Sequence, residues 1–250
     1  MRILCSNDDG INAGGLETLE RIARQLSDDV WTVAPEVDQS GMARSITLTR
    51  PLRIRKTEPQ RYAVDGTPTD CVQLGVEHLL KDHKPDLILS GINNGANVAE
   101  DVTMSGTIAA AFQGMTIGIP SVALSQVRQD RNKPPFHTAE AHAPGILRKL
   151  LDKGWADNVV MNLNFPMCEP DEVEGVVLTR QGSRDNLELF VEERMDMRQR
   201  RYYWFGFSGK PGQPKEGTDI HALWNKKVSV TPLHLQLTDD ATIDSLKDAF

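Results

Sequence analysis

The sequence predicts an α/β protein with a Rossmann-like, doubly wound and mostly parallel sheet that carries helices on both faces. Apolar runs typical of buried strands alternate with segments whose apolar residues recur at helical spacing. The strand at residues 3–5 runs into the turn-forming sequence 7–10, and a helical pattern follows at 16–26. A second strand at 30–34 completes a βαβ unit, which implies a parallel sheet.

The same alternation continues as far as about residue 161. A helix is marked by Thr67 as N-cap, Pro68 in the first helical position and Asp70 three residues after the cap. The remaining elements predicted in this stretch are strands at 87–89, 121–124 and 159–161, a helix opening near 105–107, a loop at 129–135 and a helix from about Pro144 to Leu151.

Two segments depart from the alternation within what we expect to be a single domain of residues 1–250. Residues 46–66 alternate between apolar and polar and contain Pro51, which predicts an inserted hairpin. From about residue 170 to 250 the pattern is strand-like, with a loop at 210–214. We interpret this part as an extended arm used for oligomerisation, although an antiparallel edge packed on its own sheet explains the pattern equally well.

Composition limits the classes of function. The chain is 39% hydrophobic and 25% charged, which is typical of a folded globular protein. Its net charge of -7 repels polyanions, so duplex nucleic acid is not an expected partner. Three widely spaced cysteines predict neither a disulfide framework nor a structural zinc site, and they favour a cytoplasmic location. No apolar stretch approaches the length of a membrane span, so no membrane association is expected.

Polar side chains concentrate in the loops that follow the predicted strands. In an open α/β sheet these loops meet at the carboxyl ends of the strands, where ligands bind. The adjacent carboxylates of Asp8 and Asp9 repel each other, and a cation relieves that repulsion. With the Ser40 hydroxyl and the Asn93 amide oxygen they form an all-oxygen set that suits Mg²⁺, Mn²⁺ or Ca²⁺ better than Zn²⁺. The alternative is that residues 7–10 are only a turn that begins a helix.

Other catalytic patterns are weaker. Ser105, Gly106 and Thr107 open a helix and are able to present N–H groups to a phosphate, but they also fit an ordinary helix cap. The P-loop, the G-x-G-x-x-G motif and the G-x-S-x-G elbow are all absent from the sequence, and a Ser-His triad is rejected. His137 and His142 are interpreted as solvated or capping residues.

Five motifs, in this order along the chain, resemble those of the SurE-type survival-protein nucleotidases. The resemblance runs from residue 2 to about 125, and residues 228–233 resemble the closing strand of that family. The motifs are Ser6-Asn7-Asp8-Asp9-Gly10, Val33-Ala34-Pro35 with Gln39-Ser40-Gly41, Gly66-Thr67-Pro68-Thr69-Asp70-Cys71, Ser90-Gly91-Ile92-Asn93 and Ser105-Gly106-Thr107.

The resemblance implies a divalent-metal-dependent 5′/3′-nucleotidase that hydrolyses nucleoside monophosphates and also trims short polyphosphate. It implies one cation per subunit, with Mg²⁺ or Mn²⁺ favoured, and a homodimer or homotetramer joined by carboxyl-terminal exchange. Carried over by position, the expected metal ligands are Asp8, Asp9, Ser40 and Asn93, with Asp8 or Asp9 catalytic, and the expected phosphate-side residues are Asn97, Ser105, Gly106 and Thr107.

Two rival functions use the same crevice. A nucleotide-binding or regulatory module keeps the fold without hydrolysis, because a fold does not dictate a function. A metal-dependent sugar-nucleotide transferase is disfavoured, because it prefers a D-x-D arrangement after a later strand. The sequence leaves open the base preference, the choice between 5′ and 3′ substrates, and which of Asp8 and Asp9 acts as the base.

Overall fold

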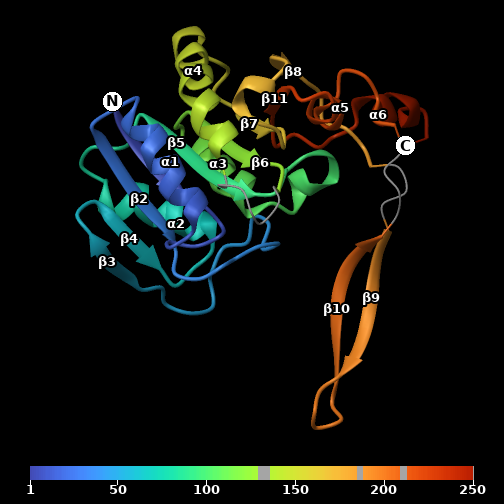
Figure 1. Cartoon of the computed structure of the whole chain (residues 1–250), viewed down its shortest axis with the longest axis horizontal. Helices are drawn as coiled ribbons and strands as arrows, with labels where there is room; N and C mark the ends of the chain where they lie inside the picture. Colours follow the sequence, from blue (N-terminus) through green and yellow to red (C-terminus); the bar gives the residue numbers. More distant parts are fainter. Residues whose placement is uncertain (129–135, 185–187, 209–212, 250) are drawn as a thin grey trace.

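A nine-stranded mixed sheet forms the centre of the molecule (Figure 1). The computed structural model describes residues 1–128, 136–184, 188–208 and 213–249. The strand order in the main sheet is β3-β4-β2-β1-β5-β6-β7-β11-β8, and β9 and β10 form a separate pair. The strands are β1 (Arg2–Ser6), β2 (Asp29–Pro35), β3 (Ile54–Glu58), β4 (Arg61–Val64), β5 (Leu87–Asn94), β6 (Ser121–Gln126), β7 (Val160–Phe165), β8 (Val176–Leu178), β9 (Glu188–Met195), β10 (Arg201–Ser208) and β11 (Val228–Leu233).

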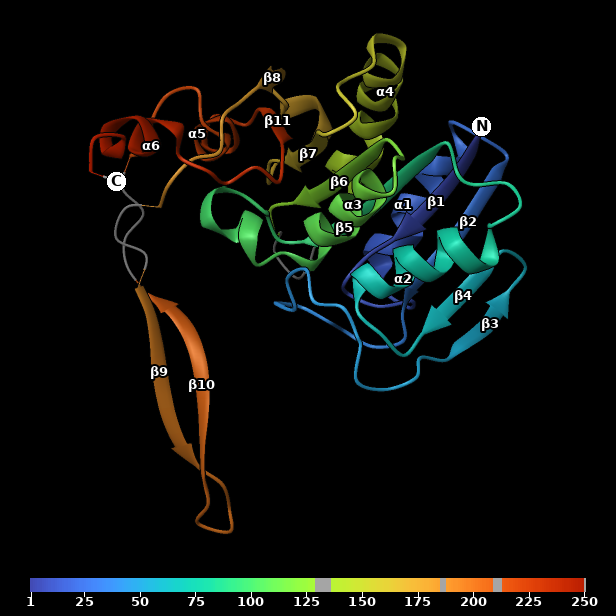
Figure 2. The same ribbon diagram turned by 180° about the vertical axis from the view of Figure 1, so that it is seen from behind.

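Helices cover both faces of this sheet, as predicted. They are α1 (Gly14–Arg24), α2 (Pro68–Leu74) continued by a π-helical turn (Gly75–Leu79), α3 (Gly106–Thr116), α4 (His137–Lys153), α5 (Asp219–Trp224) and α6 (Asp240–Leu246), with 3-10 turns at Ala99–Thr103 and Pro170–Glu172. The apolar sides of α1 and α4 pack in one core cluster with β1, β5, β6 and β7. Side chains from α2 and α3 pack in a second cluster on the opposite face, where Figure 2 shows α2 in front of the sheet. The α/β class is therefore confirmed.

The order of the parallel strands positions the site. β1 pairs with β2 on one side and with β5 on the other, and both pairings are parallel. The chain leaves β1 towards β2 and later returns to β5 on the opposite side, so the loops after β1 and β5 diverge. Such a switch point leaves a crevice at the carboxyl ends of the strands, where ligands of this architecture bind.

The hairpin predicted within residues 46–66 is present at the edge of the sheet. β3 and β4 pair antiparallel, and β4 extends the sheet by pairing parallel with β2. The loop from 36 to 53 that precedes the hairpin carries no helix or strand. This loop therefore runs past the carboxyl end of β2, next to the crevice.

Helix α4 is longer than the sequence predicted. We expected it to run from about Pro144 to Leu151. It begins at His137, and Pro144 lies inside it. Thr138, Ala139 and Ala143 are buried on this helix, and their packing offsets the loss of one backbone hydrogen bond at the proline. The predicted loop at 129–135 lies outside the described residues.

The carboxyl-terminal part is only partly an arm. β8 and β11 are strands of the main sheet, where β11 pairs antiparallel with β7, as in the alternative interpretation of an edge packed on its own sheet. The helices α5 and α6 depart from the strand-like pattern predicted from about 170 onward. Strands and helices alternate again in this part, and β11 joins the sheet because its Val228 and Val230 side chains are buried in the core. Most of the predicted loop at 210–214 lies outside the described residues.

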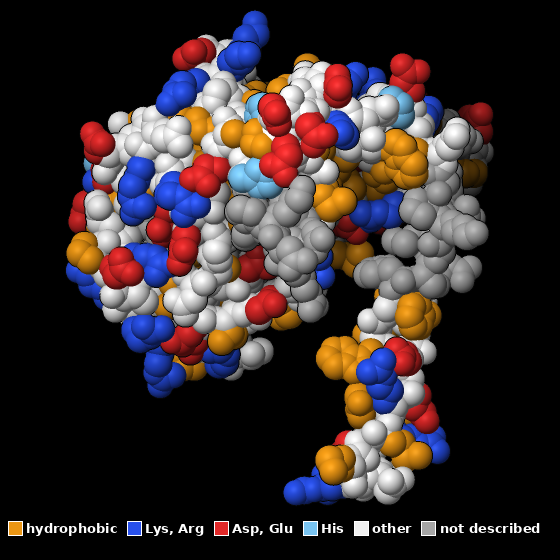
Figure 3. All heavy atoms as spheres, in the orientation of Figure 1, with side chains coloured by type: hydrophobic (Ala, Val, Ile, Leu, Met, Phe, Trp, Pro, Cys, Tyr) orange, Lys and Arg blue, Asp and Glu red, His pale blue; other side chains and the backbone are white. Residues whose placement is uncertain are grey.

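The β9–β10 hairpin projects away from the main body (Figure 1). Apolar side chains lie along it in the space-filling view (Figure 3). Tyr203, Trp204 and Phe205 of β10 are all exposed, and Phe205 is 72% exposed. Such a row of exposed aromatic side chains is typical of a surface that meets another protein. Among the described helices, none is long and apolar enough to cross a membrane.

Helix α1 lies so close to β5 that only glycine fits at position 15. A Cβ atom at Gly15 would lie 2.0 Å from the carbonyl oxygen of Ile92, whereas one at Gly14 would meet nothing within 4 Å. We expect Gly15→Ala to lower the free energy of unfolding by at least about 2 kcal/mol, because the backbone of β5 must move.

Gly14→Ala is the matched control, and we expect it to leave stability unchanged or slightly raised. Urea denaturation of both variants measures the difference. Equal stability of the two variants would contradict the close contact between α1 and β5.

Candidate functional site

The Asp8 carboxylate lies at the centre of the site, buried between the end of β1 and the start of α3. It is 4% exposed. The Thr107 hydroxyl donates a 2.5 Å hydrogen bond to Asp8 Oδ1. A Cβ atom built on Gly106 would lie 3.0 Å from Asp8 Oδ2 and 2.7 Å from Asp8 Cβ. The absence of a side chain at Gly106 therefore lets α3 begin directly against the carboxylate.

Burial changes the acidity of this group. Loss of solvent is the main cause that raises the pKa of Asp8 to about 6, and the neighbouring charge of Asp9 raises it further, while the Thr107 hydrogen bond opposes the shift. A carboxylate with a raised pKa is costly to ionise and gains strongly from a nearby cation. Among the described groups, Asp8 is thus a strong candidate for a functional carboxylate.

Asp9 faces the end of β5. The backbone N–H of Asn94 lies 3.4 Å from Asp9 Oδ2. Burial, followed by the charge of Asp38, raises the pKa of Asp9, although the Asn94 N–H acts in the other direction. In the same turn the Asn93 side-chain amide donates to the Gly95 carbonyl at 2.9 Å. Because its nitrogen is engaged in this way, the amide oxygen is the atom that Asn93 offers to a ligand.

The loop after β2 lies against the end of β1 and carries Asp38, an acidic residue whose charge acts on Asp8 and Asp9. The Gln39 N–H donates to the Asp8 carbonyl oxygen at 2.8 Å, which ties this loop to the end of β1. Asp38 Oδ1 accepts from both the backbone N–H and the hydroxyl of Ser40, at 2.7 and 2.6 Å. The Ser40 oxygen keeps lone pairs for a cation because it acts as a donor to Asp38.

Asp38 was missed by sequence reasoning. It lies two residues before Ser40 in a polar loop, and its charge acts on both Asp8 and Asp9. Its position two residues before a proposed ligand was the available signal. A short Asp-x-Ser sequence is common in turns, so that signal is weak on its own.

Asn97 is held by the ends of β6 and β7. Its backbone N–H donates to Asn164 Oδ1 at 2.8 Å, and its side-chain amide donates to the Ser125 hydroxyl at 2.8 Å. Its carbonyl oxygen accepts from the side chains of Asn162 and Asn164. The structure thus joins Asn97 to the ends of β6 and β7, whereas Gly106 and Thr107 contact Asp8 directly. Ser105 caps α3 by accepting from the Ile108 N–H at 3.1 Å.

The donor set suits a hard cation. Within the ranges that the structure describes, no three or more His, Cys, Asp or Glu side chains gather into a ready-made metal cage. The predicted set has only two carboxylates, with one hydroxyl and one amide oxygen to complete it. These donors come from the ends of β1 and β5 and the loop after β2, and oxygen ligands of this kind fit Mg²⁺ or Mn²⁺.

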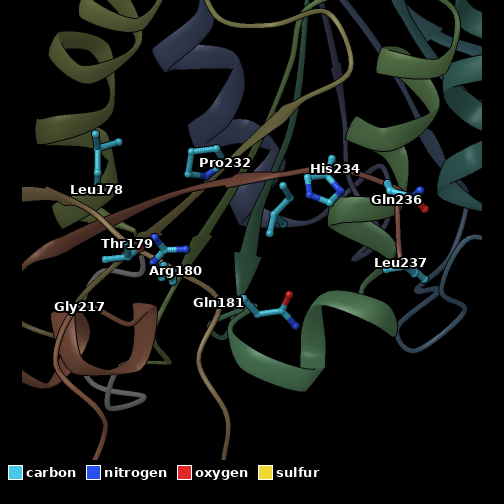
Figure 4. Close-up of a pocket in the computed structure, with 10 residues that line it drawn as sticks. Leu178, Thr179, Arg180, Gln181, Gly217, Pro232, His234, Gln236 and Leu237 are labelled. Carbon is cyan, nitrogen blue, oxygen red and sulfur yellow. The ribbon is translucent and has the colours of Figure 1, made fainter. Parts of the chain in front are cut away.

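A cavity with a volume of about 720 Å³ lies beside β8 and β11, and neither Asp8 nor Asp9 is among its described lining residues (Figure 4). Arg180, Gln181 and His234 supply polar groups, and Leu178 and Leu237 supply apolar ones. None of its described lining residues is a carboxylate. It therefore lacks the ligands that a divalent cation needs, and the carboxylates of Asp8 and Asp9 are the better candidates.

His137 and His142 serve the fold. His137 Nε2 lies 2.9 Å from Glu169 Oε2, and His142 Nε2 lies 2.8 Å from the Pro170 carbonyl oxygen. Both contacts join α4 to the start of the 3-10 segment at Pro170–Glu172, for which Glu169 is the N-cap. These contacts give both histidines a structural explanation.

Comparisons with known proteins relate this chain to SurE proteins. The family model described as Survival protein SurE matches residues 3–188. The 5′-nucleotidase SurE of Caulobacter vibrioides (strain NA1000 / CB15N) is 54% identical over 250 residues, covering 99% of this chain and 95% of that protein. The 5′-nucleotidase SurE of Rhodopseudomonas palustris (strain BisB5) is 56% identical over 245 residues, covering 96% of each. The crystal structure of the Sure protein from Aquifex aeolicus superposes with a TM-score of 0.86 at 38% identity, covering 100% of this chain and 99% of that one.

The raised pKa of Asp8 predicts a stability cost that depends on pH. Well below pH 3.8 the carboxyl is protonated in both folded and unfolded chains, so it costs nothing. Above about pH 6 it is ionised in both, and the shift from 3.8 to about 6 costs about 3 kcal/mol of folding free energy. We therefore expect Asp8→Asn to be more stable than the metal-free native chain at pH 8, and we expect most of this gain to be lost at pH 4.

Urea denaturation in the presence of a chelator measures this difference at the two pH values. Asp28→Asn is the control, because Asp28 is exposed and directly precedes the amino end of β2. A gain for Asp8→Asn of the same size at pH 4 and pH 8 would show that its origin is not ionisation.

Proposed function

The chain belongs to the SurE family, and from this premise we propose that it hydrolyses nucleoside 5′-monophosphates to nucleoside and phosphate. The observation that carries the proposal is the buried Asp8 carboxylate against the first turn of α3. Asp9 at the end of β1 and Asn93 at the end of β5 face the same crevice. Relatives that share more than half of their residues with this chain are named 5′-nucleotidases, which supports the reaction class.

The start of α3 is the proposed phosphate side of the site. Backbone N–H groups at a helix N-terminus carry partial positive charge and attract anions. Gly106 lets the Asp8 carboxylate lie against the first turn because it has no side chain, and Thr107 and Ser105 hold the turn in place through their hydroxyl groups. Asn97 is proposed to act on the same side from its fixed place beside Ser125.

We place one divalent cation, Mg²⁺ or Mn²⁺, at Asp8, Asp9, Ser40 and Asn93. When bound, such an ion supplies positive charge that polarises a phosphoryl oxygen and lowers the pKa of a coordinated water. The raised pKa values of Asp8 and Asp9 support this placement, because a cation offsets the cost of keeping both groups ionised.

Asp9 is the better candidate to orient the attacking water. One oxygen of Asp8 is engaged by Thr107, and the other lies against Gly106. Asp9 is more open to solvent, and the one hydrogen bond to its side chain from the described residues is the long contact with the Asn94 N–H. We therefore propose that Asp8 anchors the site and that Asp9 holds the water and accepts its proton at a carboxylate oxygen.

Several further properties are predicted from the family resemblance alone. These are activity on 3′-monophosphates, trimming of short polyphosphate, a cytoplasmic location and a homodimer or homotetramer formed through the carboxyl-terminal arm. The exposed aromatic row on β10 supports the oligomer, because burying it would remove a large apolar area from water.

The rival functions differ in products. A nucleotide-binding module would bind nucleotide without releasing phosphate. A sugar-nucleotide transferase would need an acceptor molecule, and its products would differ from free phosphate. Measuring phosphate without an acceptor separates both rivals from the hydrolase.

We expect chelator-stripped protein to release no phosphate from 5′-AMP and to regain activity with Mn²⁺ or Mg²⁺. Asp9→Asn removes a ligand charge and the water-orienting group, so kcat should fall about a hundredfold or more. Colorimetric phosphate assays on 5′-AMP and 3′-AMP, with each metal restored separately, measure both effects.

Asp28→Asn is the matched control, since Asp28 is exposed and directly precedes the amino end of β2, whereas the proposed site lies at the carboxyl ends of the strands. It should keep full activity. Near-native turnover by Asp9→Asn at saturating metal would overturn the role given to Asp9, and no release by the native chain with any metal would favour the binding module.

A further inference from the structure

A second, smaller cavity lies beside the carboxylate site, formed by the loop between β2 and β3 and by the residues that precede α2. Its volume is about 300 Å³, at the lower end of the range for small-molecule pockets. Gln39, Met42, Ile46 and Thr49 are among its lining residues. Gln39 is the immediate neighbour of Ser40, so the cavity adjoins the proposed cation site.

Two backbone hydrogen bonds fix this loop across the site. The Gln39 N–H binds the Asp8 carbonyl oxygen at 2.8 Å, and the Ala43 N–H binds the Met104 carbonyl oxygen at 3.2 Å. Met104 directly precedes Ser105, the cap of α3. The loop therefore spans from the metal side of the crevice to its phosphate side, with the cavity next to both.

The far wall of the cavity is preorganised by Asp70. This buried carboxylate accepts from the Thr47 hydroxyl at 2.6 Å, from the Thr47 N–H at 3.0 Å and from the Thr67 N–H at 2.9 Å. The Thr67 hydroxyl in turn donates to the Ser45 carbonyl oxygen at 2.8 Å. A wall that is already ordered loses little entropy when a ligand binds.

The chemistry of the lining favours an uncharged, flat group. Met42 is 44% exposed and Ile46 is 50% exposed, so they offer apolar surface to a ligand. Arg50 is the one charged residue among the described lining residues, and its guanidinium already binds the Asp65 carboxylate at 3.2 Å. The cavity thus lacks an unpaired charge for a second phosphate, and its hydroxyls and amides suit a polar heteroaromatic ring.

We propose that this cavity holds the base of the nucleotide substrate, with Met42 and Ile46 as its apolar walls. The inference rests on the proposed function, since it takes the phosphate to lie at Asp8 and the start of α3. Base contacts far from the reacting bond stabilise the bound substrate and the transition state alike, so they lower KM and leave kcat unchanged.

The test compares 5′-AMP with ribose 5-phosphate, which has the same phosphate and sugar but no base. In the double variant Met42→Ala, Ile46→Ala, the KM for 5′-AMP should rise about fivefold or more, because two apolar contacts are lost. Its kcat for 5′-AMP and both constants for ribose 5-phosphate should stay at native values. Thr49→Trp, which fills the cavity, should also raise the KM for 5′-AMP alone.

Leu48→Ala is the matched control, because Leu48 lies on the same loop, is 82% exposed and does not line the cavity. It should behave like the native chain with both substrates. Equal changes for the two substrates, or none in either cavity variant, would overturn the base pocket while leaving hydrolysis intact. If the native chain hydrolyses neither substrate, the proposed function itself fails, and the two failures are thus distinguishable.

Discussion

The contact between Asp8 and the first turn of α3 is the constraint on which the site depends. A carboxylate at the end of β1 and a helix that follows β5 are joined by the Thr107 hydroxyl and by the lack of a side chain at Gly106. Burying Asp8 in this way is unfavourable in the free protein, since the ionised form loses its water. The arrangement makes sense if the energy is recovered when a cation and an anionic phosphate meet at that point.

The strand order makes this contact possible. Because β5 lies next to β1 on the side opposite β2, the chain segments after the two strands separate and leave an opening between them. Gly15 lets α1 approach the Ile92 carbonyl, which keeps the end of β5, with Asn93, close to the turn that carries Asp9. The packing of one helix on one strand is therefore connected to the distance between two proposed ligands.

Much of the fold follows from local patterns. Short apolar runs predicted the central strands, and the capping box at Thr67 and Asp70 predicted the start of α2. The extent of α4 did not follow, because its first turns are fixed by burial against the sheet rather than by propensity at Pro144. The return of β11 to the sheet also depends on long-range pairing with β7, which no local window contains.

Less of the proposed site than of the fold was predictable from the sequence. Asp8 and Asp9 were identified from the sequence because two adjacent carboxylates repel each other unless a cation or a proton neutralises them. The contact of Asp8 with Thr107 was not predictable, because it depends on where α3 begins in space. Asp38 was hidden because an acidic residue in a polar loop is ordinary, and only its effect on Asp8 and Asp9 distinguishes it. The family motifs identify the site residues, but the structure is needed to show which side chains those residues contact.

Asn97 shows how far such packing reaches. The turn that follows it is held by Asp219, which accepts from the Ala99 N–H at 3.0 Å and from the Gly182 N–H at 2.9 Å. Asp219 is fully buried, and burial raises its pKa, so each of these hydrogen bonds matters for keeping it ionised. With Asn164 and Ser125 on the other side, the position of Asn97 is determined by two later strands, β6 and β7, and by helix α5. The carboxyl-terminal segment is therefore part of the architecture of the site as well as the base of the projecting hairpin, and a change in how it packs would reach Asn97 through Asp219.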